Sequence, residues 1–313
     1  MKRDGTRIAK QIIQRIAREN TTYQLADLRE FGIGECPEVG VIHSPQGLRP
    51  WAPHTHEQRL EICYLASGQR IYQREGETIY MHGGDLWLNA PGLRHGAGTH
   101  PAGPSTFYWF YLEPPGGAKN RWRGFAPRQA VRFWDLLLSR SGGIYHAGES
   151  LRPCFEQVLA RSARAAEEPW GRERMRTGYH SLLFAILDAL DTPARQSLHP
   201  GIRRALEMLD AAPMEDKFSL SALAREARLS ETYFKVQFQS GVGVSPGRYL
   251  LNRRLMAAAQ RLVATGEPIV KIAQACGFSS SQHLSTVFQR HFSTTPRRYR
   301  LNGGRLPPTA LPR

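Results

Sequence analysis

Apolar residues recur at helical spacing twice in the last third of the chain, between Ser219 and Arg300. In the first copy the positions i, i+3, i+4 and i+7 are Leu220, Leu223, Ala224 and Ala227. In the second copy they are Ile269, Ile272, Ala273 and Cys276. This spacing predicts a short helix with one apolar stripe in each copy. Because a tight polar turn follows each stripe, at 228–230 and at 277–279, the pattern indicates two helix-turn-helix units.

The repetition continues beyond the first helices. A second helix is expected in each copy, anchored by Phe234 and Phe238 or by Leu284 and Phe288. The residues after it also match: Phe238, Gly243, Ser245, Pro246 and Tyr249 are echoed by Phe288, Ser293, Thr295, Pro296 and Tyr299. The offset between the copies is 49 residues for the first helices and 50 afterwards, so the second turn is one residue longer. A plain helical bundle does not require such an internal repeat.

A long helix is predicted between the two units. Ser245 can cap it, Pro246 suits its first position, and Gly266 follows its last apolar residues. This order of cap, proline and C-terminal glycine is typical of one uninterrupted helix. We expect it to act as a rod that fixes the two units relative to each other.

The repeated segment resembles the DNA-binding domain of the AraC/XylS family of bacterial transcription regulators. The resemblance covers about the last third of the chain and rests on Ala273, Gly277, Phe278, Leu284, Phe288, Pro296, Tyr299 and Arg300. Ser293 stands where the family most often has glycine, which costs that turn left-handed backbone freedom. The resemblance implies sequence-specific binding to promoter DNA. On the same ground an activator is expected more than a repressor, with RNA polymerase as a further partner.

The outward side chains of the second helix in each unit are the candidates for contact with bases. The family's base-contact positions correspond to Thr232, Lys235 and Val236, and to Gln282, Ser285 and Thr286, and helical spacing places Ser281 on the same outward face. Gln282 can bond bidentately to adenine, Lys235 can reach guanine, and Val236 can pack on a thymine methyl group. The alternative for each is contact with phosphate or water alone. The candidates for phosphate contact are Arg248, Arg290, Arg297, Arg298 and Arg300.

Residues 39–115 have a different pattern, with short β-rich runs broken by glycine, proline and asparagine. Strands are predicted at 61–66, 69–74, 78–81, 85–88 and 107–112. Many short strands at close spacing favour a small barrel or sandwich. Helical runs follow at 130–138, 153–167 and 172–190, the last with an apolar stripe that includes Tyr179, Leu182, Leu183, Ile186, Leu187 and Leu190.

The β-rich region resembles the cupin barrel, which AraC-family proteins commonly have as a sensor domain. The matching residues are His54, His56, Glu61 and Gly68, followed by Gly84, Asp85, Pro91, Gly92 and His95. Gly47, Ala90 and Thr99 depart from the two cupin motifs without removing a ligand position. The resemblance also implies that the helices after the barrel form a dimer contact. The alternative is that their apolar stripe packs only on the barrel.

Two kinds of site are expected in the barrel. His54, His56, Glu61 and His95 form a set of three imidazoles and one carboxylate that suits zinc, manganese, iron or nickel. Since His54 and His56 share a strand face, Glu61 can join them only if residues 57–59 turn the chain. The same four side chains could instead line a pocket without metal or form a structural cluster. Aromatic and polar residues suited to a sugar or another small polar ring complete the predicted effector pocket: Cys63, Trp87, Trp109 and Tyr111. Aromatic residues at this spacing also form ordinary cores.

The expected fold class is therefore α+β with two domains, a cupin-like β-barrel with flanking helices and an all-α domain of two helix-turn-helix units joined by a long helix. The predicted segments are an N-terminal arm with a short helix (1–38), the barrel (39–115), a helical dimerisation segment (116–191), a linker (192–200), the DNA-binding domain (201–301) and a flexible tail (302–313). The helix in the arm is expected at 7–18, where Ile8, Ile12 and Ile16 are four residues apart.

Charge and cysteine usage agree with this assignment. The formal charge is +15, and the residues from Pro200 onward contribute 17 basic and 7 acidic side chains. A basic surface of this kind is typical of phosphate binding. The four cysteines show no paired spacing, and the chain has no apolar run long enough for a signal peptide or a membrane span. We therefore expect reduced thiols, a cytoplasmic location and no membrane partner.

The function expected from the sequence is a homodimeric transcription regulator that responds to a small molecule. It is not expected to be an enzyme or to require a cofactor, although the barrel could hold a divalent metal. The alternative is a metal-dependent cupin enzyme with a DNA-binding appendage, which needs an open coordination position on the metal. A third alternative is a barrel that senses nothing and only dimerises.

Overall fold

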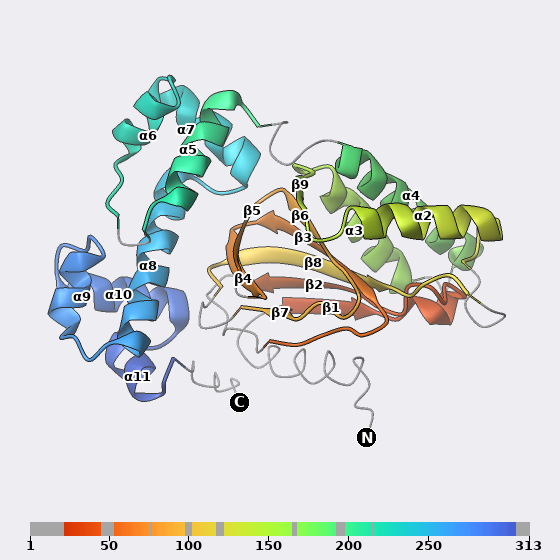
Figure 1. Ribbon diagram of the computed structural model, residues 1–313, viewed down its shortest axis with the longest axis horizontal. Helices are drawn as coiled ribbons and strands as arrows, with labels where there is room; N and C mark the ends of the chain where they lie inside the picture. The colour runs from red at the N-terminus through yellow and green to blue at the C-terminus, as the bar shows by residue number, and fades with distance from the viewer. Residues whose placement is uncertain are drawn as a thin grey trace.

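A computed structural model of the chain describes residues 22–44, 53–75, 77–97, 102–116, 122–164, 168–191, 198–213 and 216–304. The first part of the chain forms two β-sheets with helices on one side, and the last part is entirely helical (Figure 1). The fold class is α+β with two domains, as predicted.

The larger sheet of the N-terminal domain, which we call the sensor domain after the function expected from the sequence, is antiparallel, with the strand order β1-β2-β8-β3-β6-β9. Its strands are β1 (Thr22–Ala26), β2 (Val39–Ser44), β8 (Ser105–Leu112), β3 (Leu60–Ser67), β6 (Asp85–Asn89) and β9 (Ile144–His146). The smaller sheet has the order β5-β4-β7, with β5 (Glu77–His82), β4 (Gln69–Arg74) and β7 (His95–Gly96). Both sheets follow from β-branched and aromatic runs bounded by turn residues.

The central strands β3 and β8 are buried on both faces. Successive side chains of a strand point to opposite faces. Cys63 and Trp109 therefore belong to an apolar cluster between the two sheets, together with Tyr72 and Met81 of the smaller sheet. Their neighbours along the strands, such as Phe110, join a second cluster on the outer face. This double burial explains why both strands are nearly continuous apolar runs in the sequence.

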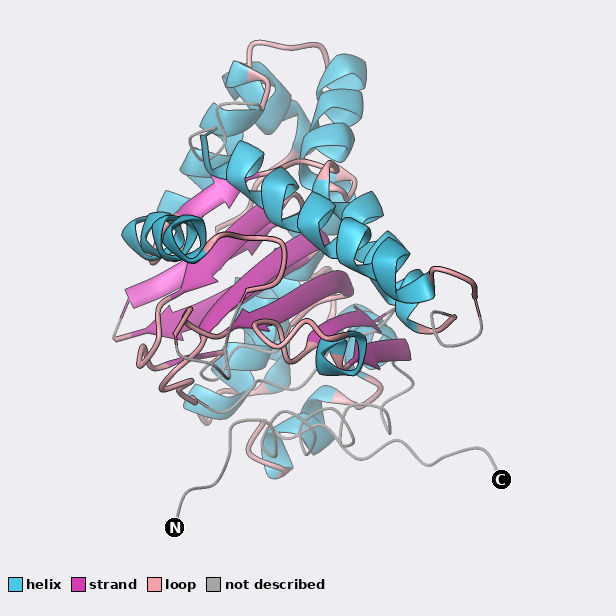
Figure 2. Ribbon diagram, turned by 90° about the vertical axis from the view of Figure 1, so that its right-hand side faces the viewer, coloured by secondary structure: helices cyan, strands magenta, loops and turns pink. Residues whose placement is uncertain are grey.

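Helices cover the outer face of the larger sheet (Figure 2). They are α2 (Pro127–Ser139), α3 (Leu151–Ser162) and α4 (Gly171–Asp191), and the short 3-10 helix η1 (Leu28–Phe31) lies at the same face. The predicted apolar stripe of α4 is buried here, because Tyr179, Leu182, Leu183, Ile186 and Leu190 all belong to the outer core cluster. The stripe therefore packs on the sheet and α3 within one chain, as the alternative expectation had it, and a dimer contact through these helices stays a prediction.

The DNA-binding domain consists of α5 (Pro200–Ala211), α6 (Leu220–Glu226), α7 (Glu231–Val242), α8 (Pro246–Ala264), α9 (Ile269–Ala275), α10 (Ser281–Phe292) and α11 (Pro296–Leu301). It has two separate cores, one around α6 and α7 and one around α9 and α10. Helix α8 contributes Tyr249 to the first core and Leu255 and Leu262 to the second. The predicted rod therefore joins the two units by being part of both.

The sheets extend beyond the predicted range 39–115. Strand β1 lies in the segment expected to be an arm and pairs with β2, whereas β9 lies in the expected helical segment and pairs with β6. A strand of three residues is too short to show an alternating pattern, and its position is set by pairing with distant residues. The expected helix at 7–18, most of the linker and most of the tail lie outside the described residues. No helix in the described part of the chain is long and apolar enough to cross a membrane.

Candidate DNA-binding surface and sensor site

The second helix of each helix-turn-helix unit begins in the same way. The Oγ of Ser230 accepts a hydrogen bond from the backbone N–H of Tyr233 (3.3 Å), and the Oγ of Ser280 accepts one from His283 (3.0 Å). Each serine thus satisfies an N–H group that has no partner within its helix. Helices α7 and α10 are both 12 residues long. The repeat in the sequence therefore produces two recognition helices of equal length.

The turns of the two units also match. Leu229 N–H donates to Ala224 O (3.0 Å), and Phe278 N–H donates to Ala273 O (2.9 Å). One residue in each turn is left-handed, Arg228 at φ 57° and Gly277 at φ 79°. The segment between the helices is 227–230 in the first unit and 276–280 in the second. The second turn is one residue longer, which confirms the change of offset in the sequence.

The outward faces of α7 and α10 carry the side chains expected to contact bases. Thr232, Lys235, Val236, Gln282 and Thr286 are exposed, and Ser281 and Ser285 are partly exposed. The anchors Phe234, Phe238, Leu284 and Phe288 are fully buried beneath them. An exposed polar face on a helix whose other face is fixed in a core can enter a major groove without disturbing the fold.

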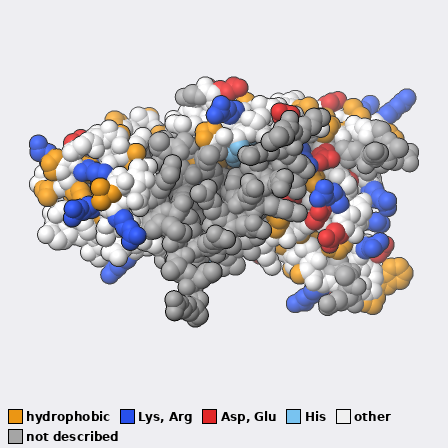
Figure 3. Space-filling view, turned by 90° about the horizontal axis from the view of Figure 1, so that it is seen from below, with side chains coloured by type: hydrophobic (Ala, Val, Ile, Leu, Met, Phe, Trp, Pro, Cys, Tyr) orange, Lys and Arg blue, Asp and Glu red, His pale blue; other side chains and the backbone are white. Residues whose placement is uncertain are grey.

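Four of the five arginines expected to contact phosphate are exposed: Arg248, Arg290, Arg297 and Arg298. Arg300 differs because its Nε donates to Leu262 O (3.1 Å) and its Nη2 to Glu267 O (2.6 Å). Its guanidinium therefore fastens α11 to the end of α8, so we do not retain it as a phosphate contact. Figure 3 shows Lys and Arg side chains spread over the left end of the molecule, where the second unit lies, with few acidic side chains among them.

Three histidines and a glutamate meet at one end of the sensor sheets. Their ligand atoms lie within 4.8 Å of one another in the set His54, His56, Glu61 and His95. His54 and His95 form a β-bridge, with N–H···O distances of 2.9 and 3.0 Å. Residues 57 and 58 form a turn before β3 begins, as Glu61 requires in order to join the histidines. His54 and His56 themselves lie outside the regular strands.

Hydrogen bonds orient the members of this His/Glu cluster. His95 Nδ1 donates to Leu93 O (3.0 Å), which directs its Nε2 toward Glu61 Oε2 at 2.7 Å. Asn89 Nδ2 donates to the same Glu61 oxygen (3.0 Å). Burial would lower the pKa of His95, but the Glu61 carboxylate raises it above its ordinary value. Burial would raise the pKa of Glu61, but the imidazoles of His95 and His56 lower it below its ordinary value. The two side chains thus form a charged pair when no other cation is bound.

The donor set fits a divalent metal ion. His56 is 7 % exposed, and its Nε2 has no hydrogen-bond partner among the described residues. Burial lowers the pKa of His56 to about 4, so its imidazole is neutral near pH 7 and has a free lone pair. Metal-ligating histidines typically donate their other ring N–H to a carbonyl, as His95 does to Leu93. Imidazole and carboxylate donors in this combination suit zinc and similar ions.

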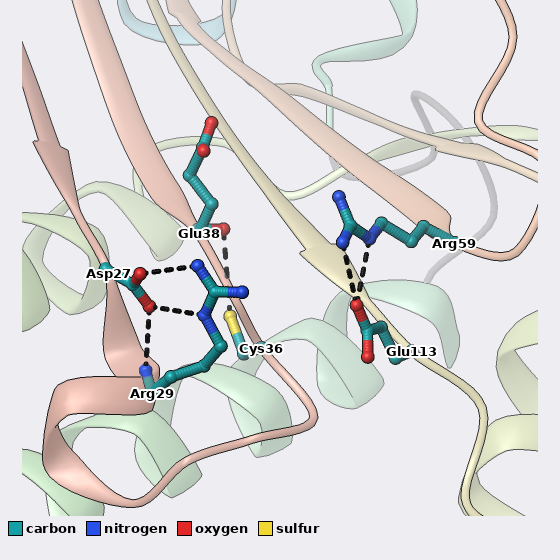
Figure 4. Close-up of polar contacts among 6 residues, drawn as sticks. All are labelled: Asp27, Arg29, Cys36, Glu38, Arg59 and Glu113. Carbon is teal, nitrogen blue, oxygen red and sulfur yellow. Dashed lines mark hydrogen bonds and ion pairs between the residues drawn. The ribbon is translucent and has the colours of Figure 1, made fainter. Parts of the chain in front are cut away.

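The residues expected to line the effector pocket lie together behind the His/Glu cluster. Cys63, Trp87, Trp109 and Tyr111 all belong to the apolar cluster between the two sheets. The Tyr111 ring lies 4.6 Å from that of His56, and the Trp87 ring 5.7 Å from that of His95. Nearby, Arg59 forms an ion pair with Glu113 (2.9 Å), which joins the start of β3 to the end of β8 (Figure 4).

Arg70 and Glu35 are among the buried charged residues that the sequence analysis did not identify. Arg70 is 3 % exposed, lies 4.1 Å from the centre of the Phe107 ring, and donates to Ser105 Oγ (3.4 Å) inside the barrel. Arg70 and Tyr72 are two residues apart on β4, so their side chains lie on the same face of the strand. This spacing was the indication that the sequence offered. Glu35 is fully buried, and burial raises its pKa to about 7. Nothing in the sequence around Glu35 distinguishes it from a surface acid.

These features define a class of protein: a two-unit helix-turn-helix protein that binds DNA, with a β-sheet domain that has a ligand-binding architecture. Comparison with known families agrees. Residues 223–302 match the model of a helix-turn-helix domain, and residues 44–175 match that of an AraC-like ligand-binding domain. The second match includes the helices α2 and α3 as well as the strands β3 to β9. The chain belongs to the AraC/RhaS family of transcriptional regulators, as the resemblance in the sequence predicted.

Relatives along the chain support this membership. The HTH-type transcriptional activator RhaS of Escherichia fergusonii is 36 % identical over 270 residues, which cover 84 % of this chain and 92 % of that protein. The arabinose operon regulatory protein of Escherichia coli K12 is 22 % identical over 74 % of this chain and 77 % of that protein. The probable transcriptional regulator LumQ of Photobacterium leiognathi is 35 % identical over 28 % of this chain, and the match spans about a third (35 %) of that protein.

Proposed function

We propose that the protein is a sequence-specific activator of transcription that binds two adjacent major grooves of promoter DNA and responds to a small molecule in its sensor domain. The observation that supports this most is the pair of equal recognition helices, α7 and α10, joined by a rod that belongs to both cores. Successive major-groove faces lie about 34 Å apart along one side of a duplex. One chain therefore covers an asymmetric site by itself.

Each recognition helix has its own specificity in this proposal. Thr232, Lys235 and Val236 contact the bases of one half-site, and Ser281, Gln282, Ser285 and Thr286 those of the other. Gln282 suits adenine, and Lys235 suits guanine. Arg248, Arg290, Arg297 and Arg298 hold the phosphates on either side. Their exposure supports this assignment.

The sign of regulation and the effector are supported by relatives and by the sensor site. Similarity to a protein described as a transcriptional activator favours activation, with RNA polymerase as the partner. A small polar molecule such as a sugar suits the polar groups and aromatic rings around His56, Trp87 and Tyr111. A relative that regulates an arabinose operon is consistent with a sugar.

A divalent metal ion in the His/Glu cluster is part of the proposal. His54, His56, Glu61 and His95 would hold it, and Asn89 would orient Glu61. A bound metal would supply a fixed positive charge toward oxygen atoms of the effector. The unpartnered Nε2 of buried His56 supports this site.

Two chains form the active species in this proposal. Three large apolar side chains remain exposed on the outer helices of the sensor domain, Val131 (46 %) and Leu136 (40 %) on α2 and Phe184 (52 %) on α4. They suit an interface with a second copy of the chain, since a pair of identical surfaces around a two-fold axis is the commonest arrangement.

Selection of bound DNA from a random pool tests the proposed function. Purified full-length protein should enrich a site with two half-sites about one helical turn apart. Gln282→Ala should relax base preference in one half-site, and Lys235→Ala in the other, each by about 1–3 kcal/mol. Arg290→Ala should weaken binding at all sequences and reduce the salt dependence by about one unit of slope. Enrichment of no sequence at all would contradict the proposal.

The His/Glu cluster also favours a second candidate function, a metal-dependent enzyme attached to a DNA-binding domain. Such an enzyme needs an open metal position and an acid or base beside it. Metal analysis of the purified protein, followed by a reporter assay of His54→Ala, distinguishes the two functions. A shifted response to the inducer supports the sensor. Metal-dependent turnover of a small sugar or organic acid would support the enzyme instead.

A further inference from the structure

The sensor domain and the DNA-binding domain meet at the turn between β5 and β6, which we name the docking turn (residues 82–85). A Cβ atom on Gly83 would lie 2.1 Å from the carbonyl oxygen of Val242, at the C-terminal end of the recognition helix α7. Gly83 does not have a positive φ, so its own backbone does not demand glycine. Glycine is needed here because of the DNA-binding domain, since any side chain at residue 83 would collide with the backbone of Val242.

A polar contact lies beside Gly83. His82 Nε2 makes a hydrogen bond with the Oδ2 of Asp210 on α5 (3.3 Å), and the His82 ring lies 5.3 Å from that of Tyr249 on α8. The side chain of His82 is 3 % exposed. Its backbone N–H donates to Asp85 Oδ2 (2.8 Å), which holds the docking turn in shape. A charge-assisted hydrogen bond in a buried contact is stronger than one on the surface.

The end of α7 also touches the turn between β3 and β4. Gly243 ends α7 with a left-handed φ of 73°. A Cβ atom there would lie 3.0 Å from the carbonyl oxygen of Ala66. The end of α7 therefore contacts two neighbouring segments of the sensor domain, the end of β3 and the docking turn, which are joined by the hydrogen bond from Gly83 N–H to Gly68 O (3.0 Å).

The docked area is limited. A cleft of about 580 Å³ opens beside it between the two domains, lined by residues that include His146, Glu149, Asp188, His199, Gln237 and Ser240. Gly103 makes a looser contact with the second unit, since a Cβ there would lie 3.4 Å from Asn252 Nδ2. Because each domain has a separate apolar core, the two can part at the docking turn without unfolding.

Strand β6 joins the docking turn to the His/Glu cluster. Asp85, at its start, bonds to His82 N–H and lies 3.1 Å from His146 Nδ1. Asn89, at its end, donates to Glu61 Oε2 (3.0 Å). Strand β6 has five residues and pairs with β3 on one side and with β9 on the other. Its hydrogen bonds thus connect Glu61 at one end with the docking turn at the other.

We propose that the docking turn holds the first helix-turn-helix unit in one orientation on the sensor domain, and that strand β6 couples this docking to the His/Glu cluster. The coupling rests on the proposed function, because it takes the His/Glu cluster as the place where a ligand acts. The docking stands without it.

Docking sets orientation and leaves the DNA-contacting face open. Thr232, Lys235 and Val236 are exposed in the docked protein, and the close contacts at Gly83 and Gly243 lie at the far end of α7. Loss of docking therefore frees the DNA-binding domain to take other orientations. Affinity for a single DNA site that one chain covers should change less than about twofold.

Hydrogen exchange of the full-length protein tests the docking. Gly83→Ala should speed amide exchange about tenfold or more on both sides of the contact, at 82–85 and at 239–243, while β2 and β8 keep their protection. Gly34→Ala is the matched control, because a Cβ on Gly34 meets nothing within 4 Å. A change at 82–85 alone, or no change, would overturn the docking proposal.

A second variant covers the case in which Gly83→Ala does not fold. Asp210→Ala removes the partner of His82 from the opposite domain, and it should speed exchange at 82–85 in the same way. Glu207→Ala on the same helix is its control, since Glu207 is 59 % exposed and forms an ion pair with Arg203 of its own helix (3.9 Å). Equal exchange at 82–85 in both variants would count against the contact.

Asn89→Ala tests the coupling. This change removes the bond to Glu61, and the proposal predicts faster exchange at the docking turn and at 239–243 as well as near Glu61. Exchange that changes only near Glu61 would overturn the coupling and leave the docking and the DNA-binding function untouched. Failure of DNA selection, in contrast, would overturn the proposed function without affecting these exchange patterns.

Discussion

The two helix-turn-helix units have the same framework but different surroundings. In both, a seven-residue helix precedes a 12-residue recognition helix that a serine caps. The first unit touches the sensor domain through the end of α7, where backbone meets backbone at Gly83 and Gly243. Near the corresponding end of α10 the described contact is looser, since a Cβ on Gly103 would lie 3.5 Å from His291 Nε2. In the described part of the chain the two copies of the motif thus differ in how closely they approach the sensor domain.

The two units also differ in the residues that adopt a left-handed backbone conformation. Each unit has one in its turn and one after its recognition helix, Arg228 and Gly243 in the first and Gly277 and Ser293 in the second. Glycine follows α7, where the sensor backbone comes close, and serine follows α10. Ser293, which departs from the family pattern, therefore lies in the second unit, where the residue after the recognition helix does not need to approach the backbone of the sensor domain.

The largest expected effects come from the core anchors. Phe238→Ala and Phe288→Ala should each lower the free energy of unfolding of the protein by about 3–5 kcal/mol, because both rings are fully buried among other aromatic rings. Urea unfolding followed by far-UV circular dichroism measures this. A loss below about 1 kcal/mol for either variant would mean that its unit lacks the packed core described above.

Low pH should destabilise the second unit more than the first. Burial lowers the pKa of His291 on α10 to about 3 from an ordinary 6.5, with a further contribution from Arg248. The first unit has Gly241 at the equivalent position. Since the unfolded chain binds a proton more readily, stability is lost as the pH falls from about 6.5 toward 3.

His291→Gln should remove that acid dependence. Between pH 7 and pH 4 the wild-type protein should lose on the order of 2–4 kcal/mol more than the variant. The comparison cancels contributions common to both proteins, such as that of Glu35. Parallel stability curves for the two proteins over this pH range would show that His291 is not buried as a neutral imidazole.

The cap that follows α7 should tolerate change poorly. Gly243→Ser places a side chain on a left-handed residue and near the carbonyl of Ala66, and it should cost about 1–2 kcal/mol in thermal unfolding measurements. Part of this cost comes from the docking contact. If Gly243→Ser were no more destabilising than the left-handed strain alone, the contact with the sensor domain would contribute nothing to the free energy of unfolding.

The smallest effects are expected from the two left-handed residues of the helix-turn-helix units that are not glycine, Arg228 and Ser293. Ser293→Gly and Arg228→Gly should each stabilise the protein by about 0.5–1 kcal/mol, because glycine adopts this backbone conformation without strain. Differential scanning calorimetry is suited to so small a change. A lower melting temperature for Ser293→Gly would indicate that the serine side chain makes a contact that outweighs its strain.

The DNA-binding domain was more predictable from sequence than the sensor domain. The reason is that its helices and turns depend on contacts between residues close together in the sequence. Helix stripes, serine caps and the longer second turn are local, so the sequence repeat predicted α6 to α11 closely. Strands β1 and β9 depend on pairing with distant partners, and three or five residues leave little pattern. The cluster of His54, His56, Glu61 and His95 was predicted because its spacing matches a known motif. Asn89, Arg70 and Glu35 could not be identified, since their importance comes from burial that only the folded chain shows.

Contacts between the domains were also beyond the sequence. Gly83 has an ordinary backbone conformation, and its requirement for glycine comes from Val242, more than 150 residues away in the chain. His82 and Asp210 belong to no motif. Sequence alone also left two alternatives open for α4, because its apolar stripe is equally suited to a dimer contact or to the sheet that covers it.

Hydroxyl-radical footprinting of full-length protein on a selected DNA site tests the central claim most directly. The account predicts two protected stretches on one face of the duplex, about one helical turn apart, from a single chain. Phe288→Ala should remove one stretch and leave the other. Protection of a single groove by the wild-type protein, or of none, would contradict the claim that two matched units joined by α8 bind side by side.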